Sequence, residues 1–258
     1  MITIVVVGGA GLVGGAVANY LNQCLGVVLK SYRRSEVDLL KPETWNGKFK
    51  DADVVLIAAG LSNGTLSQLE AVNAHGVHAL SKYCSQLGVR KLILISSGAV
   101  YGHTGRFTSP DDSLNPMTDY AKSKLMGERL AKKEFDARIN ILRLYFPYGP
   151  GEGIDRLIPR LKQKIIEGKP LICRSDGGPF LSLMHVDDMA QVIVNDFILN
   201  DTNTCEVNLA SDQILSIREL GFKISVGLGR KVYFEENSEA VDVKSLPYQF
   251  AWRPFIFY

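Results

Sequence analysis

The chain has little cysteine, no long apolar segment and no excess of either charge. Its four cysteines, Cys24, Cys84, Cys173 and Cys205, are scattered over 258 residues and form no CxxC pair. This spacing argues against a disulfide framework and a zinc site, and it favours a reducing compartment, the cytoplasm. No apolar run approaches the roughly 18 residues of a membrane span, and no basic segment precedes the first apolar run as in a signal peptide. We therefore expect a cytoplasmic protein with no metal site and no membrane partner.

The charge balance also limits the class of partner. The 29 Lys and Arg residues and the 27 Asp and Glu residues give a formal net charge of +2, without a dense basic run. Nucleic acid is therefore not an expected partner. Hydrophobic residues make up 46% of the chain, which is enough to bury a large core. We expect one large α/β domain, alone or with a small lobe.

The most informative motif is a glycine-rich turn near the N-terminus. An apolar, β-branched run directly before Gly8 predicts a strand, and a helical pattern follows the turn. Gly8 permits a tight turn, Gly11 lets backbone approach a pyrophosphate, and Gly14 lets the helix pack close to the strand. The first N–H groups of the helix, at Leu12 and Val13, then face phosphates. A plain turn also collects glycine, but the strand before it and the helix after it favour dinucleotide binding.

Strand and helix patterns alternate over the first two-thirds of the chain. Strands are predicted at 27–34, 53–60, 91–95 and 138–144, and helices at 16–25, 69–87, 120–135, 155–167 and 186–199. Continuous apolar strands between helices indicate a doubly wound parallel sheet that is covered on both faces. From about residue 149 the pattern loosens into turns and short strand-like pieces. We predict a dinucleotide-binding domain at 1–148, and at 149–258 mostly a small substrate lobe, of which about 182–200 return to the first domain.

Three residues have the chemistry of proton transfer. Tyr120 and Lys124 lie four residues apart at the start of a predicted helix, so both are on one face. A nearby ammonium favours the phenolate and lowers the pKa of the tyrosine, whose phenol exchanges a proton with a substrate oxygen while a hydride moves to or from nicotinamide. Lys124 can also bond the nicotinamide ribose. Ser97 follows a buried strand at the edge where ligands bind and would hold the same oxygen; the alternatives are a turn serine and an amphipathic helix with an exposed lysine.

Five segments occur in the order found in one protein family. They are GGAGLVG at 8–14, SSGAVYG at 96–102, YAKSKLMGE at 120–128, LRLYFPYGP at 142–150 and HVDD at 185–188. On these residues the chain resembles an extended short-chain dehydrogenase/reductase of the NAD-dependent epimerase/dehydratase family. The resemblance implies a Rossmann fold, a catalytic triad of Ser97, Tyr120 and Lys124, and a C-terminal substrate lobe. It also places Asn73 where the family often has an asparagine that steadies the lysine through water; a solvated helix residue is the alternative.

The end of the second predicted strand bears on the cofactor. NAD-preferring members place Asp or Glu there to bond both ribose hydroxyls, whereas this chain has Tyr32 followed by Arg33 and Arg34. A guanidinium pairs bidentately with a 2′-phosphate. NADP(H) is therefore favoured over NAD(H), with two arginines that merely end a surface strand as the alternative.

The resemblance also assigns the remaining cofactor contacts. Asp38 and Leu39 match the pair beside the adenine, and Ala58, Ala59 and Gly60 match the segment beside the ribose and phosphates. The complete set predicted to bind the cofactor is Gly8, Gly11, Leu12, Val13, Gly14, Arg33, Arg34, Asp38, Leu39, Ala58, Ala59, Gly60, Tyr120 and Lys124.

Other positions depart from the family pattern. Phe146 stands where many members have Asn, and Leu181 where many have Arg, which removes two polar contacts to a nucleotide diphosphate. Basic residues that would compensate are Arg156, Arg160, Lys162, Lys164 and Arg174, unless they only form a solvated basic surface. Ser97 is not followed by the Asp-Glu pair of 4,6-dehydratases, so elimination of water has no obvious catalyst. We interpret His103 as a polar loop residue and His185 as one that caps or orients local structure.

These observations predict an NAD(P)-dependent oxidoreductase or epimerase that acts at a keto or hydroxyl carbon of a nucleotide-linked sugar. Its reaction would be 4-keto reduction or 4-epimerisation, since both use the same three residues. A reductase of a non-nucleotide carbonyl substrate and a non-catalytic dinucleotide-binding sensor or scaffold are the alternatives. By the same resemblance, helices 69–87 and 120–135 would form a four-helix interface in a homodimer. The residues expected to offer apolar surface are Ala71, Val72, Ala79, Leu80, Leu125 and Ala131, unless they face their own sheet.

Overall fold

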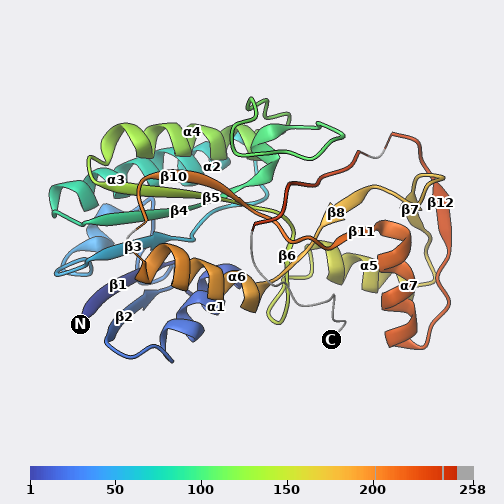
Figure 1. Cartoon of the computed structure of the whole chain (residues 1–258), viewed down its shortest axis with the longest axis horizontal. Coiled ribbons are helices and arrows are strands. Elements are labelled where there is room, and N and C mark those ends of the chain that lie inside the picture. Colours follow the sequence, from blue (N-terminus) through green and yellow to red (C-terminus); the bar gives the residue numbers. More distant parts are fainter. Residues whose placement is uncertain (201, 240, 249–258) are drawn as a thin grey trace.

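A six-stranded parallel sheet forms the body of the protein (Figure 1). The computed structural model describes residues 1–200, 202–239 and 241–248. The strand order is β2-β1-β3-β4-β5-β10, with β1 (Ile2–Val7), β2 (Val27–Tyr32), β3 (Val54–Ile57), β4 (Lys91–Ser97), β5 (Arg138–Leu144) and β10 (Cys205–Leu209). Every neighbouring pair is parallel. The expected Rossmann-type α/β fold is confirmed, with its switch point between β1 and β3.

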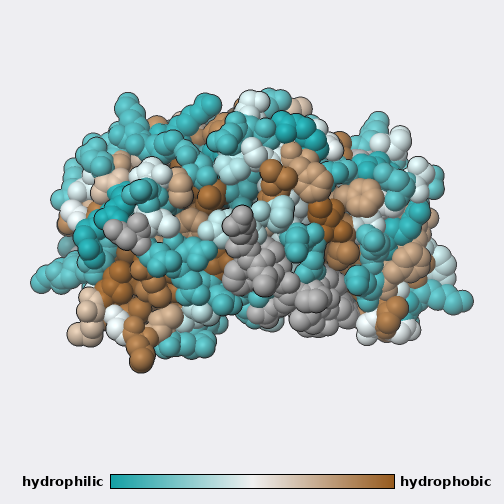
Figure 2. Space-filling model, in the orientation of Figure 1, coloured by the Kyte–Doolittle hydropathy of each residue, from teal (hydrophilic) through white to brown (hydrophobic). Residues whose placement is uncertain are grey.

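The middle strands of the sheet are mainly apolar because both of their faces are buried. In β1, Ile4 and Val6 face one core cluster, and Val5 and Val7 face the other. This alternation follows from the two-residue period of a strand, and burial on both sides explains the unbroken apolar run from Ile4 to Val7. On the face shown in Figure 2 the surface is mainly hydrophilic, with hydrophobic residues gathered in separate patches.

Helices cover the two faces (Figure 1). One face carries α1 (Leu12–Leu21) and α6 (Val186–Val192), which continues as the π-helical segment η4 (Ile193–Leu199). The other face carries α2 (Leu66–Glu70), the π-helical segment η2 (Ala71–Gly76), α3 (Val77–Gln86) and α4 (Asp119–Glu134). Short 3₁₀ turns, η1 (Pro42–Trp45) and η3 (Gly98–Tyr101), follow β2 and β4. The helix predicted at 16–25 begins earlier in the structure, at Leu12, because Gly11 is the N-cap residue of α1.

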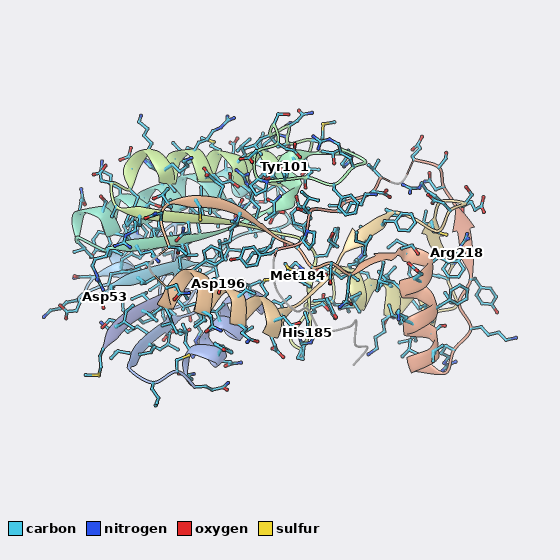
Figure 3. The ribbon with its side chains drawn as sticks, viewed as in Figure 1. Asp53, Tyr101, Met184, His185, Asp196 and Arg218 are labelled. Carbon is cyan, nitrogen blue, oxygen red and sulfur yellow. The ribbon has the colours of Figure 1, made fainter. Side chains whose placement is uncertain are left out.

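A smaller lobe lies beyond the carboxyl edge of the sheet (Figure 1). It contains α5 (Leu157–Ile166), α7 (Ile217–Leu228) and the strands β7 (Leu171–Cys173), β8 (Phe180–Ser182), β11 (Ile214–Ser216) and β12 (Phe234–Glu236). These elements enclose a separate apolar core that includes Leu161, Leu171 and Leu220. The short strands β6 (Pro147–Tyr148) and β9 (Met184–His185) pair between the body and the lobe, and Figure 3 shows Met184 and His185 at this position.

Two elements differ from the sequence prediction. At 205–228 the sequence predicts only short strand-like pieces, whereas the structure has β10 in the main sheet and the helix α7. The overlooked signal for α7 is a capping box, in which Ser216 and Glu219 bond each other's backbone N–H groups.

The segment that returns from the lobe to the main body comprises α6, which packs on α1, and also β10, which lies beyond the expected 182–200. The division at residue 148 stays a prediction, and positions 201, 240 and 249–258 of the expected lobe lie outside the described residues.

Within the described ranges, no helix is both long and apolar enough to cross a membrane. The same residues contain no cluster of His, Cys, Asp or Glu that could hold a metal ion. All four cysteines are free thiols.

Candidate active site

The turn between β1 and α1 requires glycine at two positions. Gly8 has a φ of +94°, and a Cβ there would lie 2.5 Å from the backbone nitrogen of Ala59. A Cβ on Gly14 would collide with the carbonyl oxygen of Gly8, so α1 packs directly against the turn. No side chain caps α1, which leaves the N–H groups of Leu12 and Val13 without a side-chain partner. These free donors at a helix N-terminus fit a pyrophosphate.

Two adjoining cavities follow the carboxyl edge of the sheet from this turn. The larger has a volume of about 490 Å³, and the smaller about 310 Å³. Both are lined by Gly11, Ala58, Gly60 and Leu61, so they meet at the glycine turn. Of the residues predicted to bind the cofactor, all except Gly14 line at least one of the two cavities. The combined shape suits an elongated ligand such as a dinucleotide.

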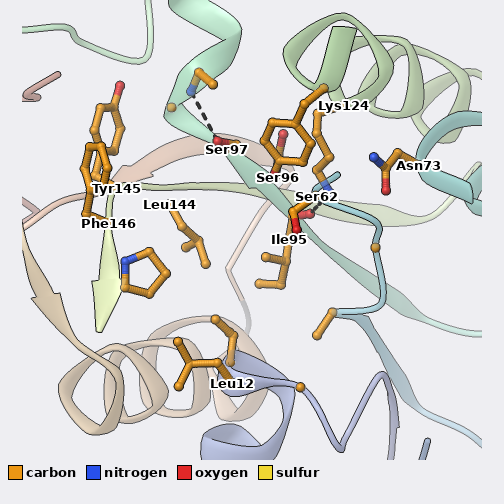
Figure 4. Close-up of a pocket in the computed structure, with 18 of the residues that line it drawn as sticks. Leu12, Ser62, Asn73, Ile95, Ser96, Ser97, Lys124, Leu144, Tyr145 and Phe146 are labelled. Atoms are coloured by element: carbon orange, nitrogen blue, oxygen red, sulfur yellow. Dashed lines mark hydrogen bonds between the residues drawn. The ribbon is translucent and has the colours of Figure 1, made fainter. Parts of the chain in front are cut away.

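The residues of the predicted triad all line the larger cavity, and Figure 4 shows Ser97 and Lys124 there. Ser97 is the last residue of β4, and Tyr120 lies in the first turn of α4. The start of α4 is fixed by Thr118, whose hydroxyl accepts a hydrogen bond from the N–H of Ala121 at 3.1 Å. Lys124 follows one turn later and is 6% exposed. The strand end and the helix start thus bring all three side chains to one place.

Electrostatics in this cavity differ from the sequence expectation. Burial raises the pKa of the Tyr120 phenol above its ordinary value, although a hydrogen bond with Ser97 and the charge of Arg156 oppose the rise. The prediction of a lowered tyrosine pKa is therefore wrong for this structure. Burial also lowers the pKa of Lys124 to about 8, against the opposing effect of Glu128. The Lys124 ammonium donates to the carbonyl oxygen of Ile95 at 2.6 Å, which aligns it with β4.

Asn73 has a structural role beside the triad. It is 1% exposed, and its amide group bonds both the N–H (2.8 Å) and the carbonyl oxygen (2.7 Å) of Leu61. It also donates to the hydroxyl of Ser123, next to Lys124, at 3.0 Å. Gly127 lets α4 approach, because a Cβ there would collide with the Asn73 carbonyl oxygen. The alternative of a solvated helix residue is wrong, and a water-mediated contact with Lys124 stays a prediction.

Arg33 and Arg34 lie at the rim of the smaller cavity. Their side chains are 69% and 72% exposed. Arg33 pairs with Glu36 at 3.3 Å, and Arg34 pairs with Asp38 at 3.2 Å. Each guanidinium therefore bonds an acidic neighbour through its Nε.

Several lining residues were not predicted. In the smaller cavity they are Ala10, Val37, Leu61 and Val72, and in the larger Ser62, Ile95, Ser96, Tyr145, Pro147 and Val243. Tyr145 and Pro147 belong to a segment that the sequence already singles out, so a signal existed for them. Val243 comes from a C-terminal segment that bridges to Leu181 in the lobe. No local pattern could reveal this long-range contact.

The structure shows where the residues that depart from the family pattern lie. Phe146 lines the larger cavity with a φ of +31°, an unusual conformation for a bulky side chain. Leu181 is 3% exposed and packs in the core of the lobe. Among the basic residues weighed as replacements, all of which are described, Arg156 alone lines the cavity. His185 is confirmed as a local cap, since its Nδ1 accepts from the N–H of Asp187 at 3.3 Å, and His103 is exposed.

Part of the expected dimer surface is buried within the chain itself. Leu80 and Ala131 are fully buried in the core under α3 and α4, and Leu125 is 5% exposed. For these three residues the expected interface role is wrong. Ala71, Val72 and Ala79 are partly exposed, and the homodimer itself stays a prediction.

Comparison with known proteins agrees with this geometry. The sequence model of the NAD dependent epimerase/dehydratase family matches residues 4–205. An uncharacterized UDP-glucose epimerase of Bacillus subtilis is 30% identical over 126 residues, which cover 46% of this chain and 40% of the relative. The dTDP-4-dehydro-6-deoxy-D-allose reductase of a Streptomyces species is 26% identical, with 88% of this chain and 82% of the relative covered. The dTDP-glucose 4,6-dehydratase of Bacillus anthracis, solved with NAD, has a TM-score of 0.79 at 22% identity, over 96% of this chain and 88% of that one.

Proposed function

Because the chain belongs to the NAD dependent epimerase/dehydratase family, we propose that it is an oxidoreductase or epimerase acting at a keto or hydroxyl carbon of a nucleotide-linked sugar. The observation that carries this proposal is the meeting of Ser97, Tyr120 and Lys124 in a cavity that joins the glycine turn. The same three side chains serve 4-keto reduction and 4-epimerisation.

The two cavities suggest how a dinucleotide would be held. The N-terminus of α1 would bind the pyrophosphate, Asp38 and Leu39 would flank the adenosine half, and Lys124 would bond the nicotinamide ribose. When bound, the cofactor supplies or accepts the hydride. Arg33 and Arg34 at the rim would pair with a 2′-phosphate, so we propose NADP(H) as the preferred cofactor.

The state of Tyr120 favours the direction of reduction. Its raised pKa keeps the phenol protonated at neutral pH, so it can give its proton to a keto oxygen. Ser97 would hold that oxygen, and the Lys124 ammonium would stabilise the phenolate that remains. Tyr120 would then recover a proton from solvent or, in epimerisation, from the substrate hydroxyl.

A dehydratase activity has less support. Among the described residues, those that line the larger cavity include no Asp or Glu. The positions after Ser97 are Gly98 and Ala99, so no carboxyl group is placed to remove or add a proton during elimination of water.

A second candidate is a reductase of a non-nucleotide carbonyl compound. It is favoured by Phe146, which gives the cavity an apolar wall, and by Leu181, which is sealed in the lobe core. Neither position can contact a diphosphate through a polar side chain.

Incubation with sugar nucleotides tests these assignments directly. Purified protein is offered UDP-, dTDP- and GDP-linked sugars and 4-keto sugars with NADPH or NADH, and the products are separated by mass and chromatography. A reductase consumes one reduced cofactor per product, whereas an epimerase changes the sugar without net consumption. Conversion of simple carbonyl compounds but of no sugar nucleotide would favour the second candidate.

A further inference from the structure

Arg156 lies in the wall of the larger cavity, and neighbouring residues accept hydrogen bonds from only some of its guanidinium N–H groups. Arg156 is the N-cap residue of α5, and its Nη2 donates to the carbonyl oxygen of Pro147 at 2.9 Å. Its Nε is buried and lies 3.5 Å from Glu152 Oε1 without making a hydrogen bond. The side chain is 40% exposed. Several N–H donors therefore remain for a ligand, on a group that Pro147 and Glu152 already orient.

The charges around the cavity show what kind of ligand these donors suit. Along the described wall, Lys124 and Arg156 are the charged residues, and no carboxylate is present. The Lys124 ammonium is bonded to Ile95 on the floor of the cavity. Arg156 is therefore the cation that remains available to a ligand beside Tyr120. Its positive charge also opposes the rise in the pKa of the Tyr120 phenol.

The neighbouring basic residues do not share this position. Arg160 lies one turn further along α5, is exposed and does not line the cavity. Arg174 pairs with Asp176 and Asp242, each at 2.8 Å. An arginine that faces a cavity with free donors is suited to bind an oxyanion through two parallel hydrogen bonds.

We infer that Arg156 binds an anionic oxygen group of the substrate, either a phosphate of a nucleotide or a carboxylate on the sugar, in the same cavity as Tyr120. This inference rests on the proposed function, since it names the substrate feature that the site selects. Glu152, which is 4% exposed, acts as the positioning partner of the guanidinium. The substrate class is thus a carbonyl or hydroxyl compound that carries a negative charge.

The test compares Arg156→Gln with the matched control Arg160→Gln. Binding of UDP, dTDP, UDP-glucose, UDP-glucuronate and uridine is measured by calorimetry in the presence of saturating cofactor. The wild-type protein and Arg160→Gln should bind at least one anionic probe more tightly than uridine. Arg156→Gln should weaken that binding about tenfold or more, the usual worth of a charge-assisted hydrogen bond. A loss for UDP and UDP-glucose identifies a phosphate, and a loss confined to UDP-glucuronate identifies a carboxylate.

Two results would overturn the inference. One is wild-type protein that binds no anionic probe more tightly than uridine, and the other is Arg156→Gln that binds every probe as wild type does. Thermal unfolding of each variant confirms that it is folded. Failure of the proposed function looks different, because hydride transfer would then be absent with every sugar nucleotide while Arg156→Gln still weakened anion binding.

Discussion

Glu128 and Arg143 form a buried ion pair beneath the candidate active site. Arg143 Nη2 lies 2.9 Å from Glu128 Oε2, and the two side chains are 5% and 3% exposed. Glu128 also accepts a hydrogen bond from Ser96, which precedes Ser97 in β4. Because Glu128 lies two turns beyond Tyr120 and one beyond Lys124 on the same face of α4, the pair fixes this helix against β4 and β5. We therefore expect the geometry of the triad to depend on that attachment.

Replacing Glu128 with Gln should therefore destabilise the protein and disturb the site. Removing one partner of a buried pair leaves an uncompensated charge, which costs about 3–5 kcal/mol of unfolding free energy. Urea denaturation measures the change. Glu134→Gln is the matched control on the same helix, because Glu134 pairs with His78 and these side chains are 25% and 32% exposed, so its loss should cost less stability than loss of the buried pair. Equal stability of the two variants would contradict a structural role for the buried pair.

The alkaline limb of the pH profile should report Lys124. Its folded pKa of about 8 lies below the ordinary lysine value of 10.5, so the ammonium is lost as the pH rises through about 8. In reduction, kcat/KM should fall above that pH, since this ratio reports groups of the free enzyme. Lys124→Arg should retain its charge and move the limb to higher pH, whereas Glu128→Gln should move it to lower pH. A wild-type profile that stays flat from pH 7 to 10 would count against this role.

The proposed preference for NADP(H) can be tested at Arg33 and Arg34. The double change to Ala should weaken NADPH binding about tenfold and leave NADH nearly unchanged, because only NADPH has a 2′-phosphate. The effect should shrink with added salt, since both side chains are exposed. Fluorescence titration of both cofactors measures it. Arg90→Ala is the control, as this exposed arginine pairs with Asp53. Tighter NADH binding by the wild-type protein would show that the two arginines only end a surface strand.

Two neighbouring glycines in α1 should respond differently to the same change. Gly14→Ala puts a methyl group into the Gly8 carbonyl oxygen, which should cost about 1–3 kcal/mol of stability and weaken cofactor binding. At Gly15 a Cβ would lie 3.3 Å from the carbonyl oxygen of Gly9, a tight contact but a longer one than the 2.3 Å at Gly14, so Gly15→Ala should cost less than Gly14→Ala. Thermal unfolding and cofactor titration of both variants measure the difference. Equal behaviour would mean that close packing of α1 on the turn is unimportant.

The sequence was informative where the signal is local. The β1 turn could be predicted because three glycines lie between an apolar run and a helical pattern. The convergence of Ser97 with Tyr120 and Lys124 could be predicted because strand ends of a parallel sheet meet at one edge. The fold follows from the same alternation of strands and helices.

Contacts between distant segments could not be predicted in this way. Val243 reaches the cavity through a bridge to Leu181, and Glu128 meets Arg143 across the interface of a helix and a strand. The direction of the Tyr120 pKa depends on burial, which a four-residue spacing does not reveal. Nor does the sequence show whether Leu80 lies in the core or at an interface, because an apolar residue suits both places.

The measurement that tests the central claim most directly is turnover by Tyr120→Phe. This change removes only the transferable proton, so turnover should fall about 10²- to 10⁴-fold while cofactor affinity stays the same. Tyr145→Phe is the matched control, because Tyr145 lines the same cavity but its hydroxyl bonds Thr108 at 2.6 Å. Both variants are assayed with the substrate found in the sugar-nucleotide screen. A large loss confined to Tyr120→Phe is the predicted result, and full activity in that variant would contradict the assigned proton transfer.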